Sequence, residues 1–317
     1  MPKLIDIHAH INFRDFREDG DEVIKRALEK DVWLINVGSQ YSTSQRAIEY
    51  AEKYKRGVYA AVGLHPIHLI EQSYETEVAG KKTKITTRAE EFDVEKYREL
   101  ALNQKVVAIG EIGLDYYWIS DEWLKENPAP EGRGSLNEIE RQKDIFKKQL
   151  QLAYELKKPV IIHCRDPKPN SASGFRIANL AIRKPSTRGR SAHQDVIEIL
   201  EEFLKDKTDF KGGTIHCFSG NWQDAQKYFQ LGFHISFTGL ITFVHNWDDI
   251  IKKAPLEKLM AETDCPYMTP APFRGKRNEP IYVEFVVRRI AELKGISFEE
   301  AAKATTENAL KLFNIPG

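Results

Sequence analysis

Cysteine, net charge and long apolar runs are all scarce in this sequence. Cys164, Cys217 and Cys265 are the only cysteines among 317 residues. Such an odd and scattered set argues against a disulfide framework and for a reducing compartment. Lysine plus arginine and aspartate plus glutamate both number 47, so the net charge is zero. No overall basic field attracts a nucleic acid, and any such affinity must come from a local patch.

The apolar segments are short. No apolar run approaches the roughly 20 residues that span a bilayer, and the opening stretch MPKLIDIHAH lacks the apolar core of a signal peptide. We therefore expect a soluble, cytoplasmic protein with no membrane partner. Apolar residues make up 41% of the chain and charged residues 30%, a composition typical of a globular protein with a sizeable core.

Eight short runs rich in valine and isoleucine alternate with longer amphipathic stretches. This alternation predicts parallel strands covered by helices. Expected helices include 136–157, 280–294 and 298–313, and we find no repeat or linker that divides the chain. We therefore predict one α/β domain over 1–317, a (β/α)8 TIM barrel. Its expected strands are 4–10, 32–37, 58–63, 106–111, 160–165, 213–218, 233–238 and 259–264.

Histidines and carboxylates stand at the ends of these expected strands. In a parallel barrel the carboxyl ends of all strands open on one face, where barrel enzymes place their chemistry. Residues far apart in the sequence therefore converge there. Burying so many imidazole and carboxylate groups without a cation would be costly, so the sequence predicts a metal site. The predicted ligands are His8, His10, Glu111, His163, His216 and Asp264.

Strand alternation supports this prediction. His8 and His10 are two residues apart, so both side chains should point inward, and Asp6 shares their face. Two histidines at this spacing are by themselves more often a surface or hydrogen-bonded pair than metal ligands. The four other predicted ligands favour the metal site. Each cysteine directly follows a predicted ligand, so we expect it to face the helical layer as a small buried apolar residue. Thiolate ligation of a structural zinc would require the opposite facing. The residues of the first strand expected to point outward are Ile5, Ile7 and Ala9.

Four imidazoles and two carboxylates exceed the needs of one cation, so we predict two divalent ions bridged by Glu111. A pair of ions deprotonates a water and stabilises the oxygens of a displacement at phosphorus. Asp264 would also take the proton of the nucleophile as a general base. Magnesium or manganese would support catalysis, and an imidazole-rich site also accepts zinc. One ion would be bound by His8, His10 and Asp264, and the other by His163 and His216.

Several longer motifs resemble those of the TatD family of metal-dependent deoxyribonucleases, which belongs to the amidohydrolase superfamily. They follow the family's order from residue 6 to residue 280, and TENALKLFNI resembles its terminal helix. The motifs are DIHAHINF, AVGLHPIH, AIGEIGLDYY, PVIIHCRD, GTIHCFSG, FTGLITF and AETDCPYMTPAPFRGKRNEP. The resemblance implies a 3'–5' exonuclease-like hydrolase that uses magnesium or manganese. Its implied substrate is DNA, single-stranded or at 3' ends.

The same resemblance assigns His65, in the motif GLHP, to the active site, where it would face a substrate phosphate. Arg165, two residues after the fifth strand's ligand, is a further candidate for substrate binding. The turn after the last strand carries Arg274 and Arg277. These arginines form a basic site beside Phe273, an aromatic residue of the type that stacks on nucleic acid bases.

Three apparent insertions relative to the family lie near 71–92, 119–135 and 166–192. They follow the third, fourth and fifth expected strands, so they belong to the catalytic face, where loops determine specificity. The third insertion is rich in arginine and lysine. It would attract phosphates as a basic flap, although a solvated loop with incidental charge fits equally well.

Two other functions remain open. The first is an amide, ester or lactone hydrolase on the same barrel, with aminoacyl-tRNA as one conceivable substrate. Superfamily relatives with that chemistry often use a carboxylated lysine at the fourth strand, where this sequence has Glu111. The second is a binding or scaffold protein without activity. The complete set of ligands argues against it.

Overall fold

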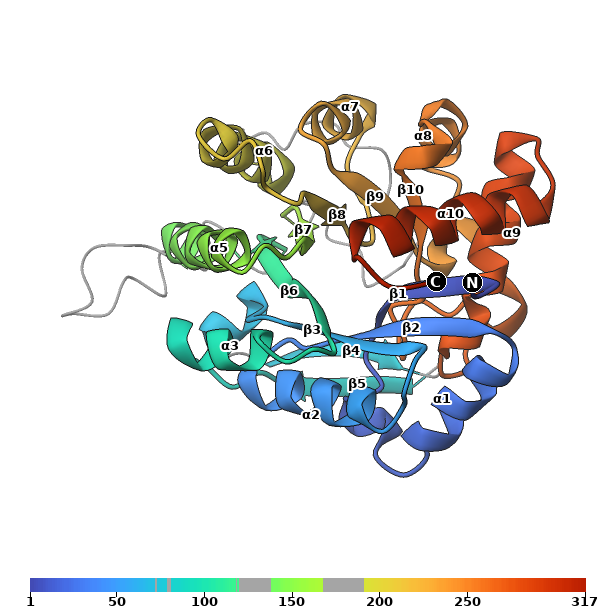
Figure 1. Ribbon diagram of the computed structural model, residues 1–317, viewed down its shortest axis with the longest axis horizontal. Helices are drawn as coiled ribbons and strands as arrows, with labels where there is room; N and C mark the ends of the chain where they lie inside the picture. Colours follow the sequence, from blue (N-terminus) through green and yellow to red (C-terminus); the bar gives the residue numbers. More distant parts are fainter. Residues whose placement is uncertain (72, 79–80, 118, 120–137, 168–190) are drawn as a thin grey trace.

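Eight parallel strands form a barrel, in the order β1-β2-β3-β6-β7-β8-β9-β10. The computed structural model describes residues 1–71, 73–78, 81–117, 119, 138–167 and 191–317. Helices surround the strands (Figure 1), so the fold is the predicted (β/α)8 TIM barrel. Within the described part of the chain, no helix is long and apolar enough to cross a membrane.

All eight predicted strands are present, and two of them, β2 and β7, have the predicted bounds. β6 runs on to Asp115, β9 is one residue shorter at each end, and β8 and β10 end early because the chain leaves the sheet before His216 and Asp264. The barrel strands are β1 Leu4–Ala9, β2 Val32–Val37, β3 Val58–Val62, β6 Val106–Asp115, β7 Val160–Arg165, β8 Gly213–Ile215, β9 His234–Phe237 and β10 Leu259–Ala261.

The helices follow the strands in the expected alternation. The three helices predicted from amphipathic periodicity are present as α5, α9 and α10, within two or three residues of the expected bounds. The described helices are α1 Gly20–Glu29, α2 Tyr41–Glu52, α3 Val94–Ala101, α5 Glu138–Glu155, α6 Ala192–Leu204, α7 Trp222–Gln230, α8 Asp248–Lys253, α9 Val283–Lys294 and α10 Phe298–Leu312.

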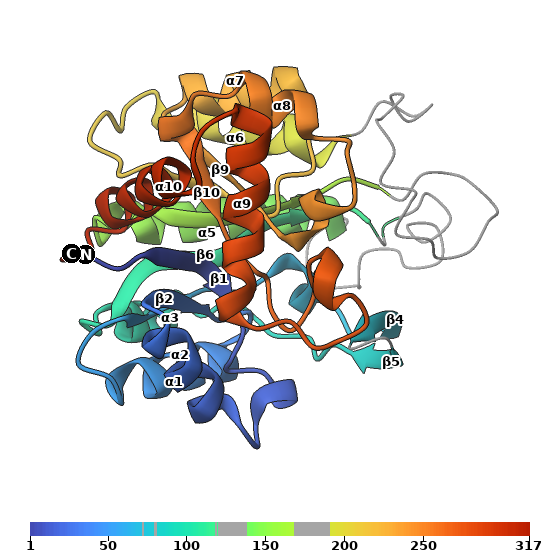
Figure 2. The same ribbon diagram turned by 90° about the vertical axis from the view of Figure 1, so that its right-hand side faces the viewer.

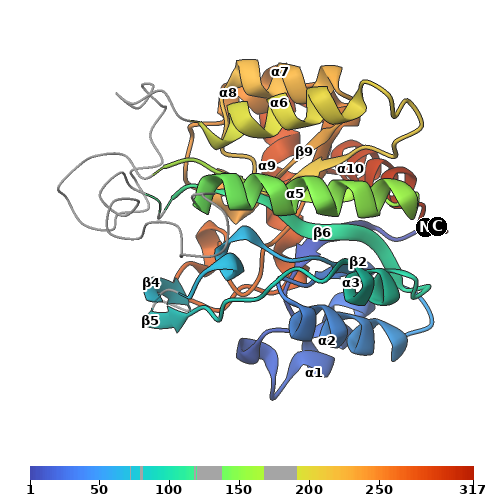
Figure 3. The same ribbon diagram turned by 90° about the vertical axis from the view of Figure 1, so that its left-hand side faces the viewer.

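The expected insertion 71–92 contains an antiparallel hairpin that the sequence did not predict. Its strands are β4 Ser73–Val78 and β5 Lys81–Thr86. Figures 2 and 3 show this hairpin at the end of the barrel opposite the two chain termini. Since it follows β3, it marks the end where the carboxyl ends of the strands open. Most of the other two expected insertions, 119–135 and 166–192, lies outside the described residues.

One hydrophobic cluster fills the interior of the barrel. It contains Ile5 of β1, Ile161 of β7 and Met260 of β10. β1 and β7 are far apart in the strand order, so their side chains meet only across the interior. Phe313 and Ile315, at the end of α10, belong to the same cluster and close the barrel at the end where the termini lie.

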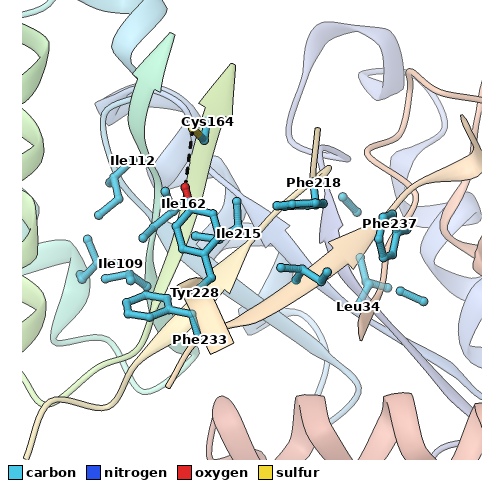
Figure 4. Close-up of a cluster of buried hydrophobic side chains, with 14 of the residues drawn as sticks. Leu34, Ile109, Ile112, Ile162, Cys164, Ile215, Phe218, Tyr228, Phe233 and Phe237 are labelled. Atoms are coloured by element: carbon cyan, nitrogen blue, oxygen red, sulfur yellow. Dashed lines mark hydrogen bonds between the residues drawn. The ribbon is translucent and has the colours of Figure 1, made fainter. Parts of the chain in front are cut away.

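A second cluster lies between the strands and the helices, and it contains two of the cysteines. The sulfur of Cys164 lies 4.0 Å from the hydroxyl of Tyr228 on α7 (Figure 4). Cys265 is fully buried, while Cys217 is half-buried and lies 3.8 Å from the hydroxyl of Thr238. Cys164 therefore faces the helical layer, as strand alternation predicted.

A bulge in β1 overturns the predicted facing of Ile5 and Ile7, while Ala9 packs in the cluster between strands and helices as predicted. Asp6 pairs with Leu34 but Ala9 pairs with Asn36, so three residues of β1 oppose two of β2. One extra residue reverses the alternation of side chains from that point onward. Ile5, before the bulge, and His10, after it, therefore lie on the same inward side despite their odd spacing, and the prediction that Ile5 points outward was wrong. The same holds for Ile7, which belongs to the interior cluster.

The barrel closes between β1 and β10. The amide of His10 donates to the carbonyl of Cys265 at 2.9 Å, and the amide of Asp264 donates to the carbonyl of His8 at 2.9 Å. Asp6 accepts hydrogen bonds from the amide (2.9 Å) and the hydroxyl (2.5 Å) of Thr263. Asp6 therefore joins the two strands at this seam, in contrast to the prediction that it shares the face of the metal ligands.

Candidate metal centre

The six predicted ligands come together at the carboxyl ends of the strands. All are buried except His163, which is half-buried. They form three overlapping groups, in each of which the ligand atoms lie within 4.8 Å of one another. The groups are His8 with His10 and Glu111, His8 with His216 and Asp264, and Glu111 with His163 and His216.

Glu111 lies at the centre and presents its two oxygens to different histidines. Oε1 lies 2.8 Å from both His163 Nδ1 and His216 Nε2. Oε2 lies 3.4 Å from His8 Nε2 and 3.8 Å from His10 Nε2. One carboxylate therefore faces two histidine pairs.

A second bulge directs this carboxylate. Ile109 pairs with Val160 but Ile112 pairs with Ile162, so β6 has one residue more than β7 around Glu111. Such bulges redirect side chains beside active sites. Sequence periodicity carries no sign of the extra residue, because a bulge depends on how the neighbouring strand pairs.

Asp264 completes the group around the first histidine pair. Its Oδ1 lies 3.4 Å from His10 Nε2 and 3.9 Å from His8 Nε2. The residue follows the end of β10 and has a positive φ of 56°, which is uncommon outside glycine and frequent at functional sites. The hydrogen bond from its backbone amide to the carbonyl of His8 holds it in this conformation at the seam of the barrel.

Three of the histidines have a partner on the ring nitrogen that points away from the centre. His10 Nδ1 lies 2.8 Å from the carbonyl of Val37, His163 Nε2 lies 3.1 Å from Asp115, and His216 Nδ1 lies 3.3 Å from Glu262. If each N–H donates to its oxygen, the other nitrogen offers its lone pair to the centre. Metal-binding histidines almost always have such partners.

Asp115 and Glu262 are functional residues that the sequence reasoning missed. Asp115 belongs to the motif EIGLD, four residues after Glu111. Glu262 precedes Asp264 by two residues, so alternation along the expected last strand was a usable signal. It is completely buried, and it accepts hydrogen bonds from the hydroxyl of Ser236 at 2.7 Å and the amide of Cys217 at 2.6 Å.

The charges at the centre favour a bound cation. Burial alone would raise the pKa of Glu111, but the neighbouring His65, His216 and His8 hold this pKa well below its usual range. Burial and the nearby carboxylates act on His216 in opposite directions, and Glu111 and Glu262 raise the pKa of its imidazole well above the usual value. Buried carboxylates thus require positive charge beside them. Imidazole and carboxylate ligands suit zinc, manganese and similar divalent ions, so the residues fit a metal centre.

His65 lies beside the centre but is arranged differently from the ligands. Its Nδ1 accepts a hydrogen bond from the amide of Ile67 at 3.0 Å. Burial lowers the pKa of His65 to about 4, so the ring is neutral and its single proton resides on Nε2. This Nε2 lies 3.3 Å from Glu111 Oε1. His65 is therefore a hydrogen-bond donor directed at the centre, and its lone pair is already used by the backbone.

The three predicted substrate-binding arginines have different surroundings. Arg165 donates to Asp115 at 2.6 Å and lies over the ring of Tyr117. Arg277 is paired with Asp19 at 2.5 Å. The guanidinium of Arg274, in contrast, lies 3.9 Å from the ring centre of Phe243 and is exposed.

A TIM barrel with a buried histidine and carboxylate centre at the carboxyl ends of its strands defines a barrel metallohydrolase. The chain matches the family described as TatD related DNase over residues 5–314, and it belongs to this family. It is therefore a metal-dependent hydrolase that acts on ester bonds.

Relatives support this assignment over the full length. The chain is 37% identical to the metal-dependent hydrolase YabD of Bacillus subtilis, covering 98% of this chain and 99% of the relative. It is 28% identical to a protein of Erwinia tasmaniensis named 3'-5' ssDNA/RNA exonuclease TatD, covering 98% and 100%. The crystal structure of the TatD homologue YjjV of Escherichia coli is 28% identical, with a TM-score of 0.74 and 99% of both chains covered.

Proposed function

We propose that this protein is a deoxyribonuclease that cleaves phosphodiester bonds at a centre of two divalent ions. The observation that carries the proposal is the position of Glu111, whose two oxygens face separate histidine pairs. A carboxylate placed in this way would offer one oxygen to each of two cations. The first ion would be bound by His8, His10 and Asp264, and the second by His163 and His216.

When bound, magnesium or manganese ions would supply an activated water and neutralise charge on the phosphate. Side chains of the protein would accept and donate the protons. Asp264 is held anionic, because His10 and His8 outweigh the effect of burial and lower the pKa of its carboxyl. It is therefore able to accept the proton of the attacking water. His65 donates its Nε2 proton toward an oxygen of the phosphate, where negative charge develops during the reaction.

DNA, single-stranded or at 3' ends, is the substrate in this proposal. The relative from Erwinia tasmaniensis is named for exonuclease action on single-stranded DNA and RNA in the 3' to 5' direction, and we propose the same direction here. Because the net charge of the chain is zero, local cations must attract the phosphates. Arg165, Arg274 and Arg277 follow the strands that carry the ligands, and we propose that they line the path of the DNA, with Arg274, which no described carboxylate pairs, supplying the charge that attracts it.

The test is digestion of end-labelled single-stranded DNA by protein stripped of metal with a chelator. Magnesium or manganese is restored in parallel reactions. Metal-dependent shortening of the label, absent in His163→Ala, supports the proposal, and the ladder of products gives the direction. His245→Ala is the matched control, because this exposed histidine pairs with Arg289 away from the centre. No cleavage with either ion would overturn the proposal and direct the search to ester or amide substrates.

A further inference from the structure

The loop after β10 leaves the metal centre and returns to it. It begins at Asp264 and is closed by Asn278, which is completely buried. The amide of Asn278 donates to the carbonyl of Pro266 at 3.1 Å, and its side chain donates to the carbonyls of Thr263 at 2.9 Å and Tyr267 at 2.6 Å. Both ends of the loop are therefore attached beside a metal ligand, and its outer residues lie at the mouth of the barrel.

The loop after β9 packs against it. This second loop contains a short 3-10 helix, η4 Gly239–Thr242. A side chain at Gly239 would collide with the backbone of Met268 and Pro270, so glycine is required for the close approach. The hydroxyl of Thr242 also accepts a hydrogen bond from the amide of Ala271 at 2.8 Å. These contacts fix the two loops relative to each other.

The two loops together build a stack of Phe243 and Arg274. The guanidinium carbon lies 3.9 Å from the ring centre, and Arg274 is exposed while Phe243 is half-buried. Gly275 has a positive φ of 82°, which allows the chain to turn directly after the arginine. Among the described residues, no carboxylate lies within ion-pair distance of Arg274. Its charge is thus available, in contrast to that of Arg277, which Asp19 neutralises.

Phe273 does not provide the stacking surface that the sequence suggested. Its ring is stacked on Tyr282, with 4.3 Å between the ring centres and 11° between the planes. The edge of Phe285 lies against it at 5.2 Å, and Lys276 lies over the ring at 5.7 Å. Phe273 therefore supports the loop from within, and Arg274 is the residue that presents a flat surface outward.

We propose that the stack of Phe243 and Arg274 is a platform that binds an unpaired nucleobase of the strand whose phosphodiester is cleaved. A guanidinium plane stacks on bases of any identity, and Arg also adds a positive charge for the backbone. Phe243 holds the guanidinium in place, so little ordering is needed on binding. A base inside a duplex is already stacked between its neighbours and is not free to reach the platform. The platform therefore selects single strands and frayed ends. This inference rests on the proposed nuclease function.

The test measures binding of single-stranded DNA to metal-loaded protein by fluorescence anisotropy. The oligonucleotide has phosphorothioate linkages, which resist cleavage, and a matched oligonucleotide consists of abasic nucleotides. Arg274→Lys keeps the charge but removes the plane. We expect it to bind the normal oligonucleotide about tenfold more weakly and the abasic one as well as the unchanged protein does. Arg274→Ala should weaken both and lower the salt dependence by about one unit of slope.

The control is Arg56→Lys. Arg56 also stacks on an aromatic residue, Trp33, at 4.8 Å, but it precedes β3 at the opposite end of the barrel. This variant should bind both oligonucleotides normally. Equal losses on the two oligonucleotides in Arg274→Lys, or no loss on either, would overturn the platform, as would the absence of binding by the unchanged protein. Base-dependent binding in this test, together with no cleavage of unmodified DNA in the digestion assay, would retain the platform and remove the nuclease assignment alone.

Discussion

The carbonyl of His8 accepts a hydrogen bond from the amide of Asp264 at 2.9 Å, which joins two of the predicted ligands across the seam of the barrel. His8 belongs to the first strand and Asp264 follows the last one. Closing the sheet therefore also brings these two residues of the centre together. A chain that did not close its barrel would leave the first histidine pair without its aspartate.

Glu111→Ala should abolish turnover, because it removes an oxygen from both histidine pairs at once. The metal-free variant should melt at nearly the same temperature as the unchanged metal-free protein, since the carboxylate is placed to bind ions and contributes little to the packing of the barrel. Digestion of single-stranded DNA with manganese and a metal-free melting curve measure the two effects. Glu99→Ala, an exposed glutamate on α3, is the control. Full activity in Glu111→Ala would remove the bridging role.

His65→Leu should lower kcat about 100-fold, as expected for the loss of one hydrogen-bond donor to the developing charge. The number of bound ions should stay the same, because the lone pair of His65 is used by the amide of Ile67. Activity and metal content measured on the same preparation distinguish a donor from a ligand. His68→Leu, in the same 3-10 turn (Pro66–Leu69), controls for disturbance of the turn. Loss of a bound ion in His65→Leu would contradict the assignment.

Glu262→Gln should weaken binding of one ion about 10- to 100-fold, because a partner carboxylate orients a ligating imidazole and raises its basicity. The affected ion is the one that His216 would bind, so the other affinity should change little. Calorimetric titration with manganese or zinc measures both. Glu257→Gln, an exposed residue just before β10, provides the control. Equal weakening of both ions would show that Glu262 supports the barrel as a whole.

Glu138, at the start of α5, should make stability depend on pH. Burial raises the pKa of its carboxyl from 4.5 to about 7. Between these values the unfolded chain releases the proton while the folded protein retains it, so the free energy of unfolding falls as pH rises. Glu138→Gln should remove this slope and stabilise the protein at pH 8 by up to about 3 kcal/mol. Urea unfolding at pH 5 and pH 8 measures it, with the exposed Glu140→Gln as the control. An unchanged slope would show that another group is responsible.

Much of the fold was predictable because its signals are local. The alternation of apolar runs with amphipathic stretches gave all eight strands, and amphipathic periodicity gave α5, α9 and α10. The hairpin of β4 and β5 was not predicted. Its two strands form a sheet of their own, outside the alternation of strands and helices that marks the barrel. The six ligands were predicted because the ends of parallel strands must share one face.

The details of the centre depend on partners that are distant in the sequence. An extra residue in β1 places Ile5 on the same side as the histidines that follow, and the pairing with β2 determines where that residue is accommodated. Which ring nitrogen of a histidine faces the centre depends on an oxygen that another element places beside the opposite nitrogen, such as Glu262 beside His216 Nδ1. Charge alone does not separate Arg274 from Arg277, because only packing shows which of them meets an aspartate.

The sequence by itself determined the barrel, the end at which the polar side chains gather and the six residues that converge there, because hydrophobic periodicity and strand polarity are properties of short segments. Only the tertiary structure decided which oxygen of Glu111 faces which histidine pair, that His65 is a donor, and that Arg274 lies free on Phe243. These features arise from hydrogen bonds and packing between separate strands and loops, and such contacts exist only once the barrel has closed.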